Sequence, residues 1–433
     1  MSFKELGLRA ELLQAVASQG YTAPTPVQTR TIPVILEGYD ILAGAQTGTG
    51  KTAAFALPLV QMLSAEPVRK KKRQPRALVL VPTRELAAQV GSVMQDYSRR
   101  VSLSATVIYG GININAQIMR LNRGVDIVVA TPGRLLDHAS RGTLDLSRVK
   151  FLVLDEADRM LDLGFIDDIL AVATFLPEKR QTLLFSATYP IGIKQLAGEL
   201  LNDPKQIEAA PPNRAANGVN QILYRVERHR KRELLSTLIK KERWQQALVF
   251  TRTRYGADKL TDQLIADNIL AAAIHSSKSQ SLRTRTLGDF KHGSVQILVA
   301  TDVAARGLDI GGLPRVVNYD LPDIAENYVH RIGRTGRAGE TGVAISLVCD
   351  QEQALLVEIE RLLNHKIPVT RLVGFLPATD HDPDIIAAKR KLKEKAAKKQ
   401  KKTIAKSTEN RKKPQKSGKP GKLKPTQKKQ KKK

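Results

Sequence analysis

The feature that most constrains the fold is the run at residues 45–52, Ala-Gln-Thr-Gly-Thr-Gly-Lys-Thr. It fits the pattern of a phosphate-binding loop, except that Ala45 stands where the strict pattern has its first glycine. A short apolar run at 41–43 precedes it, and a helix-compatible stretch at 51–65 follows. Because this motif needs a strand before it and a helix after it, the sequence predicts an α/β fold with a phosphate site after this strand.

Each part of this loop has a predicted task. Gly48 and Gly50 let backbone N–H groups turn toward phosphate oxygens, and the start of the helix adds partial positive charge. Lys51 would reach the β- and γ-phosphates, and the Thr52 hydroxyl would ligate Mg²⁺. A chance turn rich in glycine and threonine is the alternative, and the later motifs argue against it. The residues predicted to hold a nucleotide here are Gln46, Thr47, Gly48, Thr49, Gly50, Lys51 and Thr52.

The segment before the loop could recognise the base of that nucleotide. Residues 5–18 have helical apolar spacing that Gly20 ends, and Pro26 is suited to open the next helix. The amide of Gln28 carries a donor and an acceptor, so it could pair with N6 and N7 of adenine together. Tyr21 could stack on the same base. The sequence therefore predicts an adenine reader beside the phosphate loop.

Apolar runs and helical patterns alternate along most of the chain, which predicts mostly parallel sheets covered on both faces. The pattern fails between 202 and 218, where Pro204, Pro211, Pro212 and Gly218 indicate a linker. A second alternation of similar size follows, which predicts two similar α/β domains. The predicted strands are 77–81, 105–109, 125–130, 151–154 and 183–185 in the first half, and 247–250, 270–274, 295–300, 315–319 and 343–348 in the second.

The net charge of +28 is concentrated at the C-terminal end. Residues 385–433 contain 22 Lys and Arg against Glu394 and Glu409, a net charge of +20, and include no aromatic side chain. Residues 385–402 could extend a helix, and beyond them prolines and glycines among lysines predict a disordered basic tail. Such a tail indicates a polyanion partner, most simply nucleic acid, and a tail that only improves solubility is the alternative. The polar segment at 66–76 is predicted to be a solvated loop, with a secondary RNA contact as the alternative.

Cys349 is the only cysteine, so no internal disulfide can form, and its apolar surroundings at 344–348 favour a packed thiol over a reactive one. No stretch reaches the ~18 apolar residues of a membrane span, and residues 1–13 lack the apolar core of a signal peptide. These features predict a soluble protein of a reducing compartment.

A cluster of acids follows one of the predicted strands. The apolar run at 151–154 leads directly into Asp155, Glu156, Ala157 and Asp158. In a doubly wound sheet this position and the phosphate loop face the same crevice. Asp155 would hold Mg²⁺, mostly through water, and Glu156 would orient or deprotonate the attacking water. An acidic helix N-cap is the structural alternative for Asp155.

Together these motifs resemble those of the DEAD-box ATP-dependent RNA helicases, and residues 155–158 spell the family name. The resemblance covers roughly residues 3–365, and the short N-terminus and lysine-rich tail are similar to bacterial RhlE-like members. It implies two tandem RecA-like parallel-sheet domains at 1–208 and 219–375, a linker at 209–218 and a basic tail at 376–433. The implied ligands are ATP, Mg²⁺ and RNA.

In the first half the resemblance adds Phe3 to the adenine-sensing segment that contains Tyr21 and Gln28. Asp158, Ser186 and Thr188 match the residues that link hydrolysis to strand separation; Ser186 and Thr188 could also simply bond Asp158. The chemistry of the matching RNA motifs suits phosphate binding, because hydroxyls, guanidiniums and helix-start N–H groups all bind phosphate. The RNA-backbone contacts implied here are Pro82, Thr83, Arg84, Gly110, Gly111, Thr131, Pro132, Gly133 and Arg134.

In the second half the resemblance implies a further set of RNA and ATP contacts. Asp309 is implied at the nucleotide and His330 in coupling. Arg334 and Arg337 fall near one another at a helix end and match arginine fingers that reach the γ-phosphate from the other domain, with plain surface charge as the alternative. The implied RNA contacts are Thr251, Arg252, Gln280, Arg283, Thr301 and Asp302.

The resemblance therefore implies an ATP-dependent RNA helicase that locally unwinds or remodels short duplexes and ribonucleoproteins by closing two domains on the RNA backbone. A cytoplasmic monomer is expected, without a membrane partner, acting on ribosomal precursor particles or with the RNA-decay machinery. A non-enzymatic RNA-annealing protein with a vestigial nucleotide site is one alternative. A DNA helicase is the other, and it fits the Gln28 segment and residues 155–158 poorly.

Overall fold

A computed structural model describes residues 1–45, 49–66, 73–208, 219–305, 308, 310, 312–336, 342–372 and 374–375. Several predictions from the sequence lie outside these residues: Gln46, Thr47 and Gly48 of the phosphate loop, Asp309, Arg337, the linker at 209–218 and the tail at 376–433. Both sheets lie within the unit Met1–Leu376.

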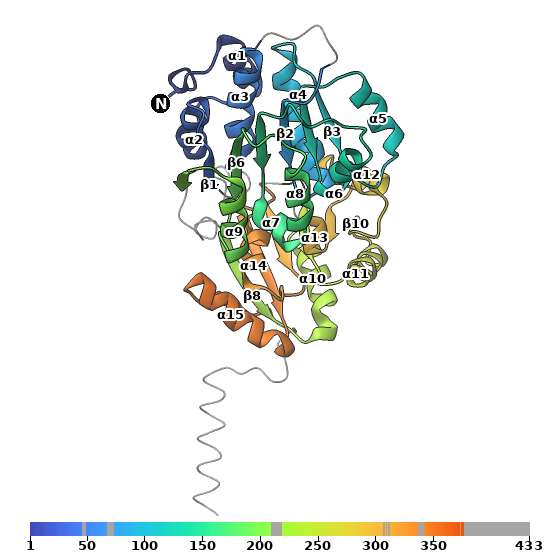
Figure 1. Cartoon of the computed structure of the whole chain (residues 1–433). Helices are drawn as coiled ribbons and strands as arrows, with labels where there is room; N and C mark the ends of the chain where they lie inside the picture. Colours follow the sequence, from blue (N-terminus) through green and yellow to red (C-terminus); the bar gives the residue numbers. More distant parts are fainter. Residues whose placement is uncertain are drawn as a thin grey trace, which may run out of the picture. The chain divides into compact units, whose positions relative to one another are not determined.

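Within the described residues the first sheet contains seven strands, all paired in parallel. Figure 1 labels β1, β2, β3 and β6 among them. Its order is β3 (Ala105–Ile108), β4 (Ile127–Ala130), β2 (Ala77–Leu80), β5 (Phe151–Leu154), β6 (Gln181–Ser186), β1 (Ile41–Gly44) and β7 (Lys205–Glu208). The helical elements are η1 (Lys4–Leu6), α1 (Ala10–Ser18), α2 (Pro26–Leu36), α3 (Lys51–Ser64), α4 (Arg84–Arg99), α5 (Ile114–Asn122), α6 (Pro132–Ser140), α7 (Ala157–Asp162), α8 (Ile166–Ala173) and α9 (Ile191–Leu200).

Alternate side chains of each strand point to opposite faces of a sheet, so a sheet buried on both faces needs two hydrophobic layers. In β2, Ala77 and Val79 join the layer formed with α1 to α4, whereas Leu78 and Leu80 join the layer formed with α6 to α9. This arrangement explains why the strand sequences are almost continuously apolar rather than alternating.

The second sheet repeats this order with seven parallel strands. Its strands are β10 (Ala271–Ile274), β11 (Ile297–Ala300), β9 (Ala247–Phe250), β12 (Arg315–Asn318), β13 (Gly342–Val348), β8 (Val219–Arg225) and β14 (Val369–Thr370). The helical elements are η3 (Arg228–Arg230), α10 (Lys231–Lys241), α11 (Arg254–Ala266), α12 (Gln280–Lys291), α13 (Asp302–Ala305), α14 (Ala325–Ile332), η4 (Asp350–Glu352) and α15 (Gln353–Leu363).

The predicted α/β class and parallel sheets are confirmed, and each predicted strand is present within one or two residues at its ends. The predicted helix at 5–18 is wrong as a single element. Gly7 adopts φ 79° and ends η1, so α1 begins only at Ala10. Strands β7, β8 and β14 were not predicted, because their mixed polar sequences give a weak strand signal.

Parallel strands bring their carboxyl ends to one edge of a sheet, and in doubly wound folds ligands bind there. In the first sheet this edge has two halves. The nucleotide motifs follow β1, β5 and β6, which are neighbours in the sheet, and the predicted RNA motifs follow β3, β4 and β2. Among the described residues, no helix is long and apolar enough to cross a membrane.

Candidate active site

The phosphate loop joins β1 to α3. Gly50 adopts φ 90° at the helix N-cap, a conformation that a side chain would strain. A Cβ atom at Gly50 would also lie 2.5 Å from Nε2 of Gln28. That amide donates to the Gly50 carbonyl at 3.1 Å, and its oxygen accepts from the Thr25 backbone N–H at 2.9 Å. The predicted adenine reader is therefore held directly against the phosphate loop.

Lys51 and Asp155 meet beside this loop. The Lys51 Nζ lies 3.5 Å from Oδ1 of Asp155, and both side chains are buried. Glu156 follows with φ 56°, left-handed for a residue other than glycine, and forms the N-cap of α7. Such backbone strain is concentrated at functional sites, where it fixes a side chain in an unusual direction. Because Glu156 occupies the N-cap position, the alternative that Asp155 is a helix N-cap is wrong.

Burial and charge act in opposite directions on this pair. Burial alone would lower the pKa of Lys51, but the carboxylates of Asp155, Glu156 and Asp158 outweigh it and raise that pKa. Burial raises the pKa of Asp155, and the cation of Lys51 opposes this rise without cancelling it. Lys51 is therefore held as a cation that faces three acidic groups.

One side-chain atom of each member of the pair has no hydrogen-bond partner among the described residues. Nζ of Lys51 and Oδ1 of Asp155 are buried and make no hydrogen bond to any described residue. Buried polar atoms without a partner are rare, so each such atom needs an explanation. A polyphosphate would give oxygens to Lys51, and a hydrated divalent cation would give water protons to Asp155. The described residues contain no group of three or more His, Cys, Asp or Glu that could hold a metal ion. One carboxylate and the Thr52 hydroxyl fit Mg²⁺, which keeps most of its own waters.

Asp158 connects this site to the end of β6. Its Oδ2 accepts from the backbone N–H of Ala187 at 3.2 Å and from the N–H and hydroxyl of Thr188, both at 3.1 Å. The hydroxyl of Ser186 accepts from the Asp158 N–H at 3.3 Å and donates to the Thr188 carbonyl at 2.6 Å. The predicted bonds between Asp158 and the Ser-Ala-Thr segment are confirmed.

The predicted RNA residues of the first domain gather after β2, β4 and β3. Gly111 adopts φ 79°, and a Cβ atom there would lie 2.1 Å from an Nη atom of Arg84. The adjacent glycines 110 and 111 thus leave room for a guanidinium. Arg134 donates to the Ile112 carbonyl at 3.2 Å. Thr83 caps α4 through its hydroxyl, while Thr131, Pro132 and Gly133 stand at the start of α6. The structure therefore brings these residues together.

The corresponding residues of the second domain follow β9, β10 and β11, in the same half of its edge. Thr251 and Thr301 are buried, and Asp302 begins α13. Gln280 and Arg283 both contact one carboxylate oxygen of Glu85 on α4, at 3.0 and 2.9 Å. Arg159 on α7 donates to the Val303 carbonyl on α13 at 3.0 Å. Residues after both sheets thus contact one another.

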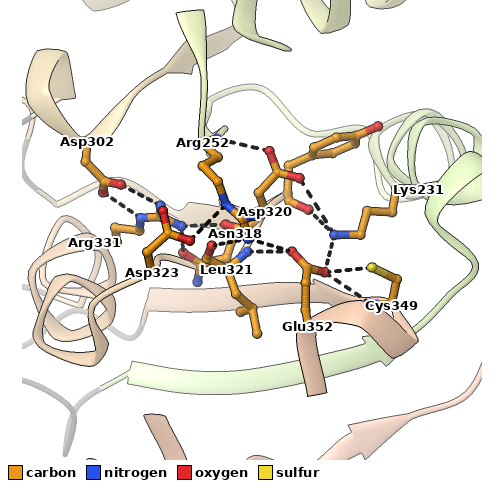
Figure 2. Close-up of polar contacts among 11 residues, drawn as sticks. Lys231, Arg252, Asp302, Asn318, Asp320, Leu321, Asp323, Arg331, Cys349 and Glu352 are labelled. Carbon is orange, nitrogen blue, oxygen red and sulfur yellow. Dashed lines mark hydrogen bonds and ion pairs between the residues drawn. The ribbon is translucent and has the colours of Figure 1, made fainter. Parts of the chain in front are cut away.

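The buried side chain of Arg331 connects several polar groups at the edge of the second sheet (Figure 2). Its guanidinium is almost wholly buried and binds both carboxylate oxygens of Asp302 at 2.7 Å. It also donates to the Asn318 side chain at 3.0 Å and to the Asp320 carbonyl at 2.6 Å. The carboxylate of Asp302, a predicted RNA contact, is therefore neutralised by an internal arginine.

A second buried charge pair lies beside it. Lys231 and Glu352 meet at 2.5 Å, and Glu352 also accepts from the backbone N–H groups of Leu321 and Cys349. Burial alone would raise the pKa of Glu352, but the cation of Lys231 and the hydrogen bonds from Cys349 together outweigh burial and lower it. The thiol of Cys349 is buried and donates to Glu352 at 3.1 Å, so the predicted packed thiol is confirmed.

Both halves of the chain match family models of helicase domains. Residues 25–196 match the DEAD/DEAH box helicase domain, and residues 230–339 match the helicase conserved C-terminal domain. The chain is 44% identical over 366 residues to the DEAD-box ATP-dependent RNA helicase CshA of Bacillus cereus, covering 84% of this chain and 69% of that protein. This chain belongs to the DEAD-box ATP-dependent RNA helicases. It is therefore an RNA-dependent ATPase and helicase by family.

Other relatives of this DEAD-box helicase agree. The protein RhpA of Helicobacter pylori is 41% identical over 84% of this chain and 73% of its own length. The fold matches yeast Dbp5 bound to RNA and ADP BeF3 with a TM-score of 0.75 and 33% identity, covering 86% of this chain and 95% of that chain. The RhlE-like subgroup is not confirmed, since these bacterial relatives are named CshA and RhpA.

The other predicted residues of the helicase differ in how far they are buried. Phe3 is buried in the hydrophobic layer of the first domain, whereas Tyr21 is about half exposed. Arg334 is buried and donates to the Leu308 carbonyl at 3.3 Å, and His330 is partly buried on α14. These contacts leave their predicted roles untested.

Sequence reasoning missed Arg331, Lys231, Asp320 and Glu352. A signal for two of them was available. Lys231 opens the helix after β8 as Lys51 opens the helix after β1, and Asp320 follows β12 closely, much as Asp155 follows β5. Comparing the helix starts and the strand ends of the two domains would have pointed to both residues.

Proposed function

We propose that this DEAD-box helicase hydrolyses ATP at the Lys51–Asp155 pair while RNA lies across the other half of the same edge. The observation that carries this proposal is the buried pair whose Nζ and Oδ1 atoms make no hydrogen bond within the described residues. ATP supplies phosphate oxygens for Lys51, and Thr52 with Asp155 would hold Mg²⁺. When bound, Mg²⁺ neutralises part of the charge on the phosphates.

In this proposal Glu156 directs water at the γ-phosphorus. Water forms the new P–O bond, the bond to the β-phosphate oxygen breaks, and Glu156 accepts the proton that the water loses. The products are ADP and inorganic phosphate. Gln28 would read adenine while still contacting the loop through Gly50, so base recognition and phosphate binding are mechanically joined. Arg334 and Arg337 would approach the γ-phosphate on domain closure.

RNA would bind through its phosphates and 2′-hydroxyls at the first-domain group around Arg84 and Arg134 and the second-domain group around Arg252 and Thr301. The hydrogen bonds of Asp158 to residues 187 and 188 support a coupling role, because they tie the acidic motif to the next strand. Cytoplasmic location, a monomeric state and targets in ribosomal precursors or RNA decay stay predictions.

The test replaces Glu156 by Gln in the full chain. ATP affinity should stay within several-fold, because Lys51, Thr52 and Asp155 remain, whereas RNA-stimulated turnover should fall by about 10² or more. Release of phosphate and binding of a fluorescent ATP analogue measure the two quantities. Asp167→Asn on α8 is a matched control, because it removes an exposed acid of the same domain that belongs to none of the predicted motifs.

Near-normal turnover in Glu156→Gln would contradict the assignment. An unsubstituted protein that anneals RNA without RNA-stimulated ATP hydrolysis would favour the non-enzymatic alternative.

A further inference from the structure

Arg252 is the predicted RNA contact whose surroundings are most unusual. It follows β9 near the middle of the second sheet, and its backbone N–H donates to Oδ2 of Asp320 at 3.0 Å. Its side chain faces three acceptors, as Figure 2 shows. One Nη donates to the Leu321 carbonyl at 3.3 Å and lies 3.7 Å from Glu352, while Nε lies 3.2 Å from Asp323. Arg252 is thus held by Asp320, Leu321 and Glu352 on its inner side and paired with Asp323 on its solvent side.

The two carboxylates differ in how firmly they are held. Glu352 is 6% exposed and is fixed by Lys231, Leu321 and Cys349. Asp323 is 66% exposed, and the guanidinium it faces is 42% exposed. An exposed ion pair contributes little to stability, whereas separating a buried charge from its partners costs several kcal/mol. Only the Asp323 contact can therefore be exchanged at low cost.

A phosphate is chemically suited to replace this carboxylate. A guanidinium pairs with carboxylate and phosphate through the same planar N–H groups. The Glu352 and Leu321 contacts would keep Arg252 in place while its outer N–H group changes partner.

We propose that Asp323 occupies the phosphate position at Arg252 in the RNA-free helicase and lowers RNA affinity by competing with the backbone. This inference rests on the proposed RNA contact of Arg252. RNA must displace Asp323 to reach Arg252, so the acid acts as an affinity-determining residue outside the recognised motifs.

The test is a double-mutant cycle in the full chain. Binding of a fluorescein-labelled oligoadenylate is measured in the presence of ADP and beryllium fluoride at fixed salt. Asp323→Asn keeps the side chain's shape and should tighten RNA binding about two- to fivefold, the scale of an exposed ion pair. In an Arg252→Gln background the same substitution should change the affinity by less than the error of the assay.

Glu233→Gln is the matched control for charge. Glu233 on α10 is 53% exposed and pairs with Nε of Arg230 at 3.1 Å. The substitution therefore removes another exposed, arginine-paired acid without touching a predicted RNA contact. It should leave RNA affinity unchanged.

The outcomes distinguish failure of this inference from failure of the proposed RNA helicase function on which it rests. No gain from Asp323→Asn overturns the inference, and so does a gain that persists in Arg252→Gln or appears equally in Glu233→Gln, because it would reflect net charge alone. Failure of the unsubstituted protein to bind the oligonucleotide contradicts the proposed function itself.

Discussion

In each sheet of this helicase a lysine opens the helix after one strand and approaches an aspartate that follows another strand, but the two lysines differ in their hydrogen bonds. In the first, Lys51 opens the helix after β1 and lies 3.5 Å from Asp155 after β5. In the second, Lys231 opens the helix after β8 and lies 3.8 Å from Asp320 after β12. The first pair has buried atoms without hydrogen-bond partners, whereas Lys231 bonds the Tyr319 carbonyl and the Glu352 carboxylate.

The same arrangement of strands and helices thus carries a predicted ligand site in the first domain and a structural ion pair in the second. In the second domain Glu352 supplies from within the chain an anion to the helix-opening lysine. In the first domain Asp155 lies 3.5 Å from Lys51, but no described side chain accepts a hydrogen bond from the Lys51 Nζ, so this atom can still bind an anion from outside. In the second domain the lysine instead holds the turn that positions Arg252 and Arg331.

Replacing each lysine with methionine is the most direct test of whether the two lysines have different roles. Lys51→Met should lower RNA-stimulated ATP hydrolysis by about 10³, because it removes a cation aimed at the phosphates. Lys231→Met should leave the ATP concentration for half-maximal rate nearly unchanged at temperatures where it is folded. Steady-state ATPase assays of both variants measure these effects. An equal loss of ATP affinity in Lys231→Met would mean that the second lysine also serves the nucleotide.

The order of effects should reverse for stability. Lys231→Met leaves Glu352 buried without its cation, which costs about 3–5 kcal/mol. Lys51→Met should cost much less in the absence of nucleotide, because Lys51 makes no hydrogen bond within the described residues and Asp155 can take up a proton. Denaturant unfolding of the two variants without ATP compares them. Equal destabilisation would show that Lys51 also supports the fold.

The sequence predicted the first of these two sites far better than the second. The phosphate loop and Asp155–Glu156 are recognisable because their spacing and glycines are dictated by the ligand. Lys231, Asp320 and Glu352 are separated along the chain, and pairing among side chains tolerates many arrangements. Strand positions were predictable from apolar runs, but β8 was not, because its polar residues Asn220, Gln221 and Arg225 hide the pattern. The break at Gly7 depends on a local backbone conformation that helical spacing does not reveal.

The smallest expected effect tests the internal anion of the second domain by its pH dependence. The pKa of Glu352 is lowered in the folded protein, so its stabilisation is complete above the unfolded pKa, near 4.5, and is lost as the pH falls through the lower folded value. Glu352→Gln removes a charged acceptor and should destabilise the protein by about 2 kcal/mol at pH 7. The difference in unfolding free energy between this variant and the unsubstituted protein should then become smaller under acid conditions, where Glu352 itself becomes protonated.

Denaturant unfolding of both proteins at neutral pH and at several values below about 4.5 measures this gap. Glu233→Gln is the control, because its exposed carboxylate is paired only at the surface and should give a small difference at every pH. A gap for Glu352→Gln that stays constant into acid would mean that the carboxylate's shape, rather than its charge, supports Lys231. The second site would then differ from the first by packing, and the view of Glu352 as a built-in substitute for phosphate would fail.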